Sequence, residues 1–309
     1  MPNIASVLNI TRLYSAISGV SSLRRALAIA SSYAIVRRVG AGSDEDDSRL
    51  LSNNSMHAAF LADAEVMCRG LTHLTMGVAR MLGESECATS LSPQKAALLR
   101  LLTPATKASS AEHSGRGVLV AMEALGGLGY MDETGIGRLM QDTTVERIWE
   151  GTQNVLALDV VRVVTQSKGQ AASHLAGWAQ ATLEAAPNSL TRDCQDSFST
   201  ANDALVLIGR ASEAWCGGSK DTQHARHLLY LVALVATTVF LVEHATWAVS
   251  QHEDAILDVE LIRRWSRHSA WSESSRVVHE ALGAGTATQA QRATFDRQLA
   301  FGYSARCKL

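Results

Sequence analysis

Apolar residues recur along much of the chain at alternating steps of four and three, the spacing of one packed face of a helix. The clearest run comprises Phe60, Ala64, Met67, Leu71, Leu74, Val78 and Met81. A similar run near the start comprises Val20, Leu23, Leu27, Ala30 and Ala34. Both runs predict long helices, each packing along a bundle through one apolar seam.

A third helix is predicted to begin after Ser92, whose hydroxyl can cap a helix with Pro93 in its first turn. That helix carries Leu98, Leu101 and Leu102. Pro104 is expected to kink the helix or to restart it. A fourth apolar helical pattern follows Glu150. Four helices joined by modest loops predict an all-α fold, an up-and-down four-helix bundle over residues 1–169.

The second half, residues 170–309, is predicted to form a helical extension of that bundle. Its apolar centres are Ala204–Ile208 and Leu228–Val242. The second run lies between His227 and Glu243 and is shorter than the roughly 20 residues that a membrane span needs. We therefore expect a buried core helix there and no membrane span.

Composition agrees with a helical chain that has a sizeable core, because 47% of residues are hydrophobic and prolines number four. The five cysteines form no C-x-x-C pair and no metal-ligand spacing, so they are interpreted as reduced, mostly buried thiols. His224 and His227 lie one helical turn apart without a third ligand nearby. The sequence thus predicts no metal site.

Charge argues against a nucleic-acid partner. Residues 170–309 contain 12 Lys and Arg against 14 Asp and Glu, whereas a nucleic-acid-binding face needs a basic excess. The short cluster from Arg263 to Arg267 is better interpreted as a solvated helix face.

A glycine cluster, Gly126-Gly127-Leu128-Gly129, follows the helical stretch Val118–Leu125. A dinucleotide-binding fingerprint needs a strand before its glycines, so this cluster is not one. Glycines directly after a helix commonly form its C-cap. They also let a ligand approach the backbone closely. Both interpretations stay open from the pattern alone.

A second motif, Glu150-Gly151-Thr152, precedes the fourth helical pattern. The simplest interpretation of Glu150 is an acid favoured by the dipole at a helix start. Trp149 beside it makes partial burial of the carboxylate plausible, and partial burial strengthens a carboxylate as a base. The motif is therefore also a candidate for acid–base chemistry.

Together, at this spacing, the two motifs resemble the C-terminal signature of the flavin-dependent acyl-CoA dehydrogenases. The resemblance covers roughly residues 4–169 and continues more loosely to the end. It implies α,β-dehydrogenation of an acyl-CoA thioester, with FAD as cofactor and Glu150 as the base that removes the α-proton. Some branches carry the base on the first helix of this domain, where this chain has Thr11, which leaves Glu150 as the candidate.

The resemblance also assigns contacts to the flavin. Thr152 and Asn154 match positions that contact FAD, while Glu123, Gly126 and Gly127 match a strip that contacts the FAD of a partner subunit. Relatives carry an Arg followed by Phe-Gly that reaches a neighbour's flavin pyrophosphate. Here the sequence is Arg37-Arg38-Val39-Gly40, followed by an acidic stretch, so one of the two arginines, Arg37 by preference, is expected to keep the role.

Three further residues are implied in substrate binding. Asn9 and Arg12 match the first helix of the domain, where an Asn or Asp and an Arg help hold the acyl-CoA, and Gly151 follows the base. A solvated helix charge is the alternative interpretation of Arg12. Glu123 departs from the Gln of many relatives, which exchanges a donor for an acceptor.

The family's dehydrogenases begin with a helical domain and a central β-domain that supplies much of the flavin-ring pocket, and this sequence matches neither. The isolated chain is therefore expected to bind FAD weakly or not at all. A non-catalytic helical subunit or remnant that associates with complete dehydrogenases is the alternative function. A homo-oligomer or association with family members is expected, and the electron acceptor is not readable. The helical extension resembles the alkylation-response branch of the family.

The chain ends Cys307-Lys308-Leu309, which resembles the C-terminal Ser-Lys-Leu peroxisomal signal. Peroxisomes host acyl-CoA β-oxidation, so the address and the implied chemistry agree. The sequence predicts a peroxisomal protein, with the cytoplasm as the alternative.

Overall fold

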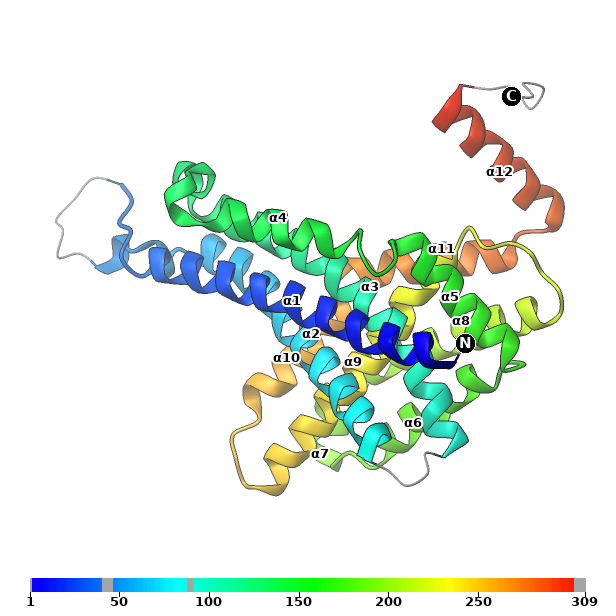
Figure 1. Ribbon diagram of the computed structural model, residues 1–309. Helices are drawn as coiled ribbons and strands as arrows, with labels where there is room; N and C mark the ends of the chain where they lie inside the picture. The colour runs from blue at the N-terminus through cyan, green and yellow to red at the C-terminus, as the bar shows by residue number, and fades with distance from the viewer. Residues whose placement is uncertain (1, 41–46, 88–91, 303–309) are drawn as a thin grey trace.

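The computed structural model describes residues 2–40, 47–87 and 92–302. Within these ranges the chain is helical, and the β-structure consists of one isolated bridge between Arg38 and Leu50. The all-α prediction is confirmed (Figure 1). The C-terminal tripeptide and most of the acidic stretch after Gly40 lie outside the described residues.

The first half of the chain contains five helices, of which three are long rods (Figure 1). They are α1 (Pro2–Ala34), α2 (Ser55–Cys87), α3 (Pro93–Ala124), α4 (Ile136–Glu146) and α5 (Gln153–Gln166). Short 3-10 helices form the connections: η1 (Asp47–Arg49), η2 (Leu51–Asn53), η3 (Gly126–Tyr130) and η4 (Asp132–Thr134). The second half contains α6 (Gln170–Glu184), α7 (Asn188–Asp193), α8 (Gln195–Cys216), α9 (Ala225–Ser250), α10 (Ile256–Arg267), α11 (Ser269–Gly283) and α12 (Thr286–Phe301).

Both predicted seams face the core. The buried members on α1 are Val20, Leu23, Leu27, Ala30 and Ala34, and those on α2 are Ala64, Met67, Leu71, Leu74 and Val78. Phe60 and Met81, at the two ends of the α2 seam, are partly buried and pack against the same clusters. The heptad spacing therefore identified the packed faces of these two helices.

The start of α3 is also as predicted, whereas one of the two alternatives expected at Pro104, a restart of the helix, does not occur. The Ser92 side chain accepts a hydrogen bond from the Lys95 amide, and Pro93 occupies the first turn. The helix does not restart at Pro104, because α3 runs without interruption to Ala124. Every residue from Leu101 to Gly115 is buried, and we attribute the tolerance of the missing proline N–H to this packing.

The stretch between the two motifs is not a simple connection, as the sequence had suggested, but contains α4. Ile136 is fully buried, and Leu139 and Met140 pack against the cluster formed by α1 and α3. This helix follows Gly135, which has a φ of +70°. It runs back along α3 and places the second motif beside the middle of that helix (Figure 1).

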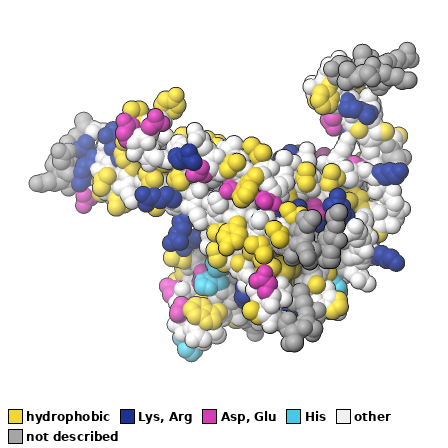
Figure 2. Space-filling model, in the orientation of Figure 1, with side chains coloured by type: hydrophobic (Ala, Val, Ile, Leu, Met, Phe, Trp, Pro, Cys, Tyr) yellow, Lys and Arg dark blue, Asp and Glu magenta, His cyan; other side chains and the backbone are white. Residues whose placement is uncertain are grey.

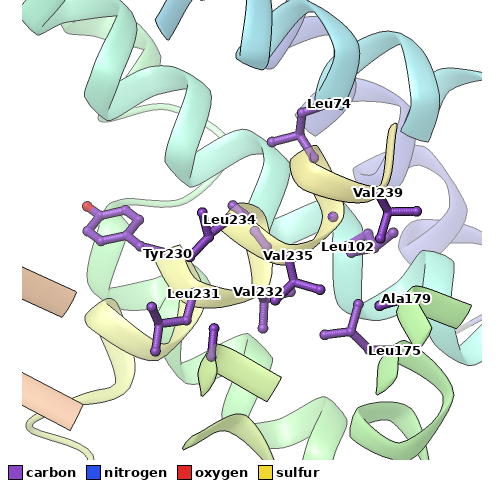
Figure 3. Packing of buried hydrophobic residues seen from close by; sticks show 14 of the residues in the cluster. Leu74, Leu102, Leu175, Ala179, Tyr230, Leu231, Val232, Leu234, Val235 and Val239 are labelled. Atoms are coloured by element: carbon purple, nitrogen blue, oxygen red, sulfur yellow. The ribbon is translucent and has the colours of Figure 1, made fainter. Parts of the chain in front are cut away.

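The run Leu228–Val242 lies inside α9, the central helix of the molecule, and every residue of the run is buried. In Figure 3, Leu74 of α2, Leu102 of α3 and Leu175 of α6 lie around this run, and all three belong to the same hydrophobic core. Within the described part of the chain, α9 is the one helix long and apolar enough to cross a membrane, and 89% of that window is buried. The predicted core helix is thus present, although it extends beyond the apolar run at both ends.

One hydrophobic core includes residues of both halves, among them Leu71, Leu102, Leu156, Leu175 and Leu231. Close approach is possible because α2 carries two glycines at the contact. A Cβ at Gly70 would lie 2.3 Å from the Trp265 ring, and one at Gly77 would lie 2.5 Å from the Phe240 ring. The boundary between residues 169 and 170 remains a prediction, and the core crosses it.

The described cysteines carry free thiols. Cys68 and Cys194 are buried, whereas Cys87 and Cys216 are exposed. The expected mostly buried character therefore holds for half of them.

Candidate functional site

The turn that carries Glu150 joins α4 to α5 in an uncommon backbone conformation. Glu150 has a φ of +57° and Gly151 a φ of +109°, both in the left-handed region that disfavours side chains. A Cβ at Gly151 would also lie 3.3 Å from Leu156. Thr152 is the N-cap residue of α5, as expected of a motif that opens a helix. The Glu150 side chain is half-buried.

Three polar contacts fasten this turn to the middle of α3. Arg147 pairs with the buried Glu112 at 2.6 Å. The Lys107 ammonium donates to the Gly151 carbonyl at 2.7 Å, and the Gln153 amide donates to the Ala108 carbonyl at 3.0 Å. The turn is therefore held at residues 147, 151 and 153, on both sides of Glu150.

Lys107 is fully buried, which is rare for a lysine. Burial lowers the pKa of Lys107 to about 8, while Glu146 and Glu150 act in the opposite direction. No carboxylate oxygen lies within 4 Å of its nitrogen in the described part of the chain. Its hydrogen-bond partner is thus a backbone carbonyl of the candidate motif.

A second carboxylate, Glu146, lies beneath the turn at the end of α4 and is 4% exposed. It accepts hydrogen bonds from Ser15 of α1, at 2.5 Å, and from the indole N–H of Trp149. Trp149 therefore binds Glu146 and is itself 45% exposed, and the Glu150 carboxylate beside it is partly buried, as the sequence had suggested.

The predicted substrate residue Arg12 is buried and forms an ion pair with Asp159 of α5 at 2.7 Å. Arg100 and Arg162 bind the same carboxylate at 2.6 and 3.1 Å. Burial raises the pKa of Asp159, but the hydrogen bonds from Arg100 and Arg12 outweigh it and hold the pKa below its usual value. Three guanidinium groups thus surround one carboxylate. The result corrects the alternative in which Arg12 is a solvated charge.

Asn9 lies one helical turn before Arg12 on α1 and is half-buried. Asn154, in the first turn of α5, and Thr152 are exposed. The structure therefore brings one group of predicted residues together beside the middle of α3, namely Asn9, Arg12, Glu150, Gly151, Thr152 and Asn154.

The other predicted residues lie where α1 and α3 end. Glu123, Gly126 and Gly127 are exposed where α3 ends, about 24 Å of helix beyond Lys107. Gly126, with a φ of +59°, follows the last turn of α3, as expected of a C-cap glycine. Arg37 is exposed just past the end of α1, which runs in the same direction as α3 (Figure 1). One chain thus presents two separate groups of candidate residues.

The sequence interpretation missed Lys107, Glu112, Glu146, Asp159 and Ser15. One signal was available for Lys107, because the residues three and four positions away on either side are Thr103, Pro104, Ser110 and Ala111. A helical lysine without a local acidic partner can be held by a distant acceptor, here the Gly151 carbonyl.

The histidines do not point to a metal. His224 is buried and stacks on Trp215, with ring centroids 5.2 Å apart, whereas His227 faces Ser274 at 3.3 Å. Within residues 2–40, 47–87 and 92–302, no group of three or more His, Cys, Asp or Glu side chains could hold a metal ion.

Residues 6–165 match the family model of the acyl-CoA oxidase C-alpha1 domain. Acyl-CoA dehydrogenase family member 11 of Caenorhabditis elegans is 32% identical over 250 residues, which are 79% of this chain and 39% of that protein. The putative acyl-CoA dehydrogenase AidB of Escherichia coli is 43% identical over 70 residues, 23% of this chain and 13% of that protein.

A solved structure extends the similarity to nearly the whole chain. The crystal structure of Caenorhabditis elegans ACDH-11 in complex with C11-CoA superposes with a TM-score of 0.79 at 28% identity, and the match covers 96% of this chain and 47% of that one. The helical extension is included in this match. The chain spans less than half the length of these relatives.

Proposed function

The chain belongs to the acyl-CoA dehydrogenase and oxidase family, and from this premise we propose that it supplies the base for FAD-dependent α,β-dehydrogenation of an acyl-CoA thioester. The observation that carries the proposal is the turn at Glu150. Its left-handed backbone and its three contacts with α3 hold a half-buried carboxylate at the surface of the bundle. Such a pre-organised carboxylate suits proton transfer.

In the proposed reaction the thioester's α-carbon lies against the Glu150 carboxylate. Glu150 takes the α-proton, and the rigid turn limits the number of carboxylate positions from which it can do so. A flavin bound beside the turn would supply the acceptor for the hydride that leaves the β-carbon. Lys107 and Glu146 are placed behind the turn and keep their contacts with protein groups.

An acyl-CoA carries several phosphate charges, and the group around Asp159 has the opposite sign. Arg12, Arg100 and Arg162 exceed the single carboxylate by two charges, and Arg162 is 61% exposed in its side chain. Exposed arginines bind phosphate well. We assign phosphate contacts to Arg100 and Arg162 and a supporting role to the buried Arg12, with Asn9 beside it.

The residues present fit a flavin in part. Thr152 and Asn154 offer exposed polar groups next to Glu150, and the backbone of Gly126 and Gly127 is open, because an added Cβ would meet nothing within 4 Å. The two groups are separated by about 24 Å along α3, from Lys107 behind the turn to Glu123. We therefore assign them to two different flavins. A flavin at Glu150 then needs further walls from other domains. Glu123 and one of Arg37 and Arg38 contact the second flavin, which belongs to a neighbouring chain.

A flank of exposed apolar side chains surrounds the same turn and supports an assembly. Its members are Val145, Ile148, Trp149, Val155 and Leu158, each more than 40% exposed. The flank equally fits the second candidate function. In that case the chain is a non-catalytic helical subunit, and a complete family member binds to this face and covers it.

A nucleic-acid partner is not part of the proposal. On the face in Figure 2, basic and acidic side chains are interspersed, whereas nucleic-acid binding needs a basic field. Arg264 pairs with Glu260 and Arg267 with Asp196, so the basic cluster on α10 is largely neutralised.

The experiment joins this chain behind the N-terminal helical and β-domains of a family member. The purified protein is loaded with FAD and mixed anaerobically with acyl-CoA thioesters of several lengths. Bleaching of the flavin absorbance supports the dehydrogenase. A protein that binds FAD and acyl-CoA without bleaching supports the non-catalytic subunit.

A further inference from the structure

Resting on the role proposed for Glu150, we propose that Lys107 is the positioning residue of this site. Its buried side chain holds the Gly151 carbonyl and thereby fixes the left-handed turn that presents the Glu150 carboxylate.

The position of Lys107 in the fold requires an explanation of its own. It is among the largest side chains that are fully buried, and it reaches the turn across 44 residues of sequence. A buried ammonium is costly unless polar groups satisfy it. The acceptor within reach is the Gly151 carbonyl, at 2.7 Å. The burial of Lys107 is thus coupled to one conformation of the turn.

The conformation of the turn also depends on the hydrogen bond from Lys107. Two successive residues, Glu150 and Gly151, have positive φ angles, and a non-glycine residue keeps this conformation when its surroundings enforce it. Arg147 and Gln153 fasten the two ends to α3. Of these three contacts, the hydrogen bond from Lys107 is made to a left-handed residue itself, Gly151.

Charge adds to the hydrogen bond. The ammonium lies among the side chains of Arg12, Glu146 and Glu150, and the two carboxylates favour its protonated form against burial and against Arg12. Glu146 is fixed by Ser15 and Trp149. The Lys107 charge therefore attracts the Glu150 side chain toward the α3 side of the turn.

The test uses the full chain without flavin. The Leu156 amide donates to the Thr152 carbonyl at 3.0 Å in the first turn of α5, and the Leu228 amide donates to His224 at 3.0 Å in the first turn of α9. Amide hydrogen exchange at these two positions separates local opening from global unfolding. Lys107→Met removes the donor and keeps the shape, and Lys95→Met, at an exposed lysine of the same helix, is the matched control.

We expect Lys107→Met to accelerate exchange of the Leu156 amide roughly tenfold or more, the usual scale for losing a charged hydrogen bond, and to leave the Leu228 amide unchanged. Lys107→Gln, which keeps an N–H donor, should fall between that variant and the wild type. Lys95→Met should match the wild type at both amides. Equal exchange at Leu156 in wild type and Lys107→Met, or equal acceleration at both amides, would overturn the proposal.

A second measurement decides the matter if Lys107→Met does not fold. The chain has five lysines, so an NMR titration of ¹³C-labelled lysine can follow Lys107. Its pKa should lie near 8, and Glu150→Gln should lower it, because Glu150 raises it. A Lys107 titration that does not respond to Glu150→Gln would refute the coupling. Neither measurement involves flavin chemistry, so its failure is distinct from failure of the proposed dehydrogenation.

Discussion

Arg12 and Asp159, 147 residues apart in sequence, form an ion pair at 2.7 Å that joins the start of α1 to the middle of α5. Both side chains are less than 10% exposed. Asp159 lies on α5, the helix that begins just after the Glu150 turn, and the arginines around this pair are the ones to which we assign the proposed phosphate contacts. Most of the candidate site therefore depends on contacts between residues distant in sequence.

The first prediction concerns this pair. Asp159→Asn leaves three guanidinium groups around a neutral amide, and loss of one partner of a buried pair typically costs about 3–5 kcal/mol. Urea unfolding should show a loss of this order. Glu280→Gln, which removes the exposed partner of Arg276, should change stability by less than about 0.5 kcal/mol. Equal effects of the two substitutions would mean that the Asp159 pair contributes no more than a surface pair.

The second prediction concerns pH and His113, whose ring lies against Tyr230 and Trp271. Burial, together with His268, Arg116 and Arg147, lowers the pKa of His113 to about 3, whereas an unfolded histidine titrates near 6.5. The unfolded chain binds the extra proton between these values. The stability from neutral His113 is thus complete above about pH 6.5 and is lost as the pH falls toward 3.

The measurement is the free energy of unfolding between pH 7 and 4. His113→Gln should reduce its dependence on pH by up to about 1.4 kcal/mol per pH unit, while the exposed His279→Gln should leave the dependence as it is in the wild type. The account of His113 fails if its substitution alters stability equally at all pH values.

The third prediction concerns the address in the cell. A fluorescent protein fused in front of the chain should appear in peroxisomal puncta, because the terminal Cys307-Lys308-Leu309 resembles a peroxisomal signal. Deleting these three residues should return the fluorescence to the cytosol. Diffuse or mitochondrial fluorescence from the intact fusion would contradict the prediction.

The fourth prediction concerns the flavin. The isolated chain should bind FAD weakly or not at all, since the residues assigned to it lie exposed in two separate groups, one beside the middle of α3 and one where α1 and α3 end. Equilibrium dialysis of the purified chain against FAD measures this directly. Stoichiometric, tightly bound FAD would show that the chain encloses a flavin pocket without other domains.

The long helices of this fold could be predicted from the sequence, because seam residues such as Leu71 and Leu74 repeat at helical spacing whatever they pack against. α4 could not be, since Gly135 and Gly137 at its start are typical of a loop and its apolar run is short. The expectation that the helix could restart at Pro104 failed for a related reason. The effect of this proline on α3 depends on tertiary packing, which overrides local propensity.

The part of the candidate site that lies within one continuous motif could be predicted from the sequence. Glu150, Gly151 and Thr152 are adjacent in sequence, so a motif that opens α5 could be expected, whereas the positive φ of Glu150 could not. The partners of the turn could not, because Lys107 and Glu112 resemble ordinary helical charges until the fold buries them. Which helical charges are buried depends on contacts across 35 or more residues.

The central claim is that Glu150 is the base. It is tested by single-turnover flavin reduction in the protein completed with the family's N-terminal and β-domains, comparing wild type, Glu150→Gln and the exposed Glu133→Gln. Loss of a general base typically slows the step about 10²–10⁴-fold, so Glu150→Gln should keep the fold and acyl-CoA binding but lose flavin bleaching by at least that factor, and Glu133→Gln should bleach as the wild type does. A folded Glu150→Gln protein that reduces its flavin at the wild-type rate would contradict the claim and place the base elsewhere.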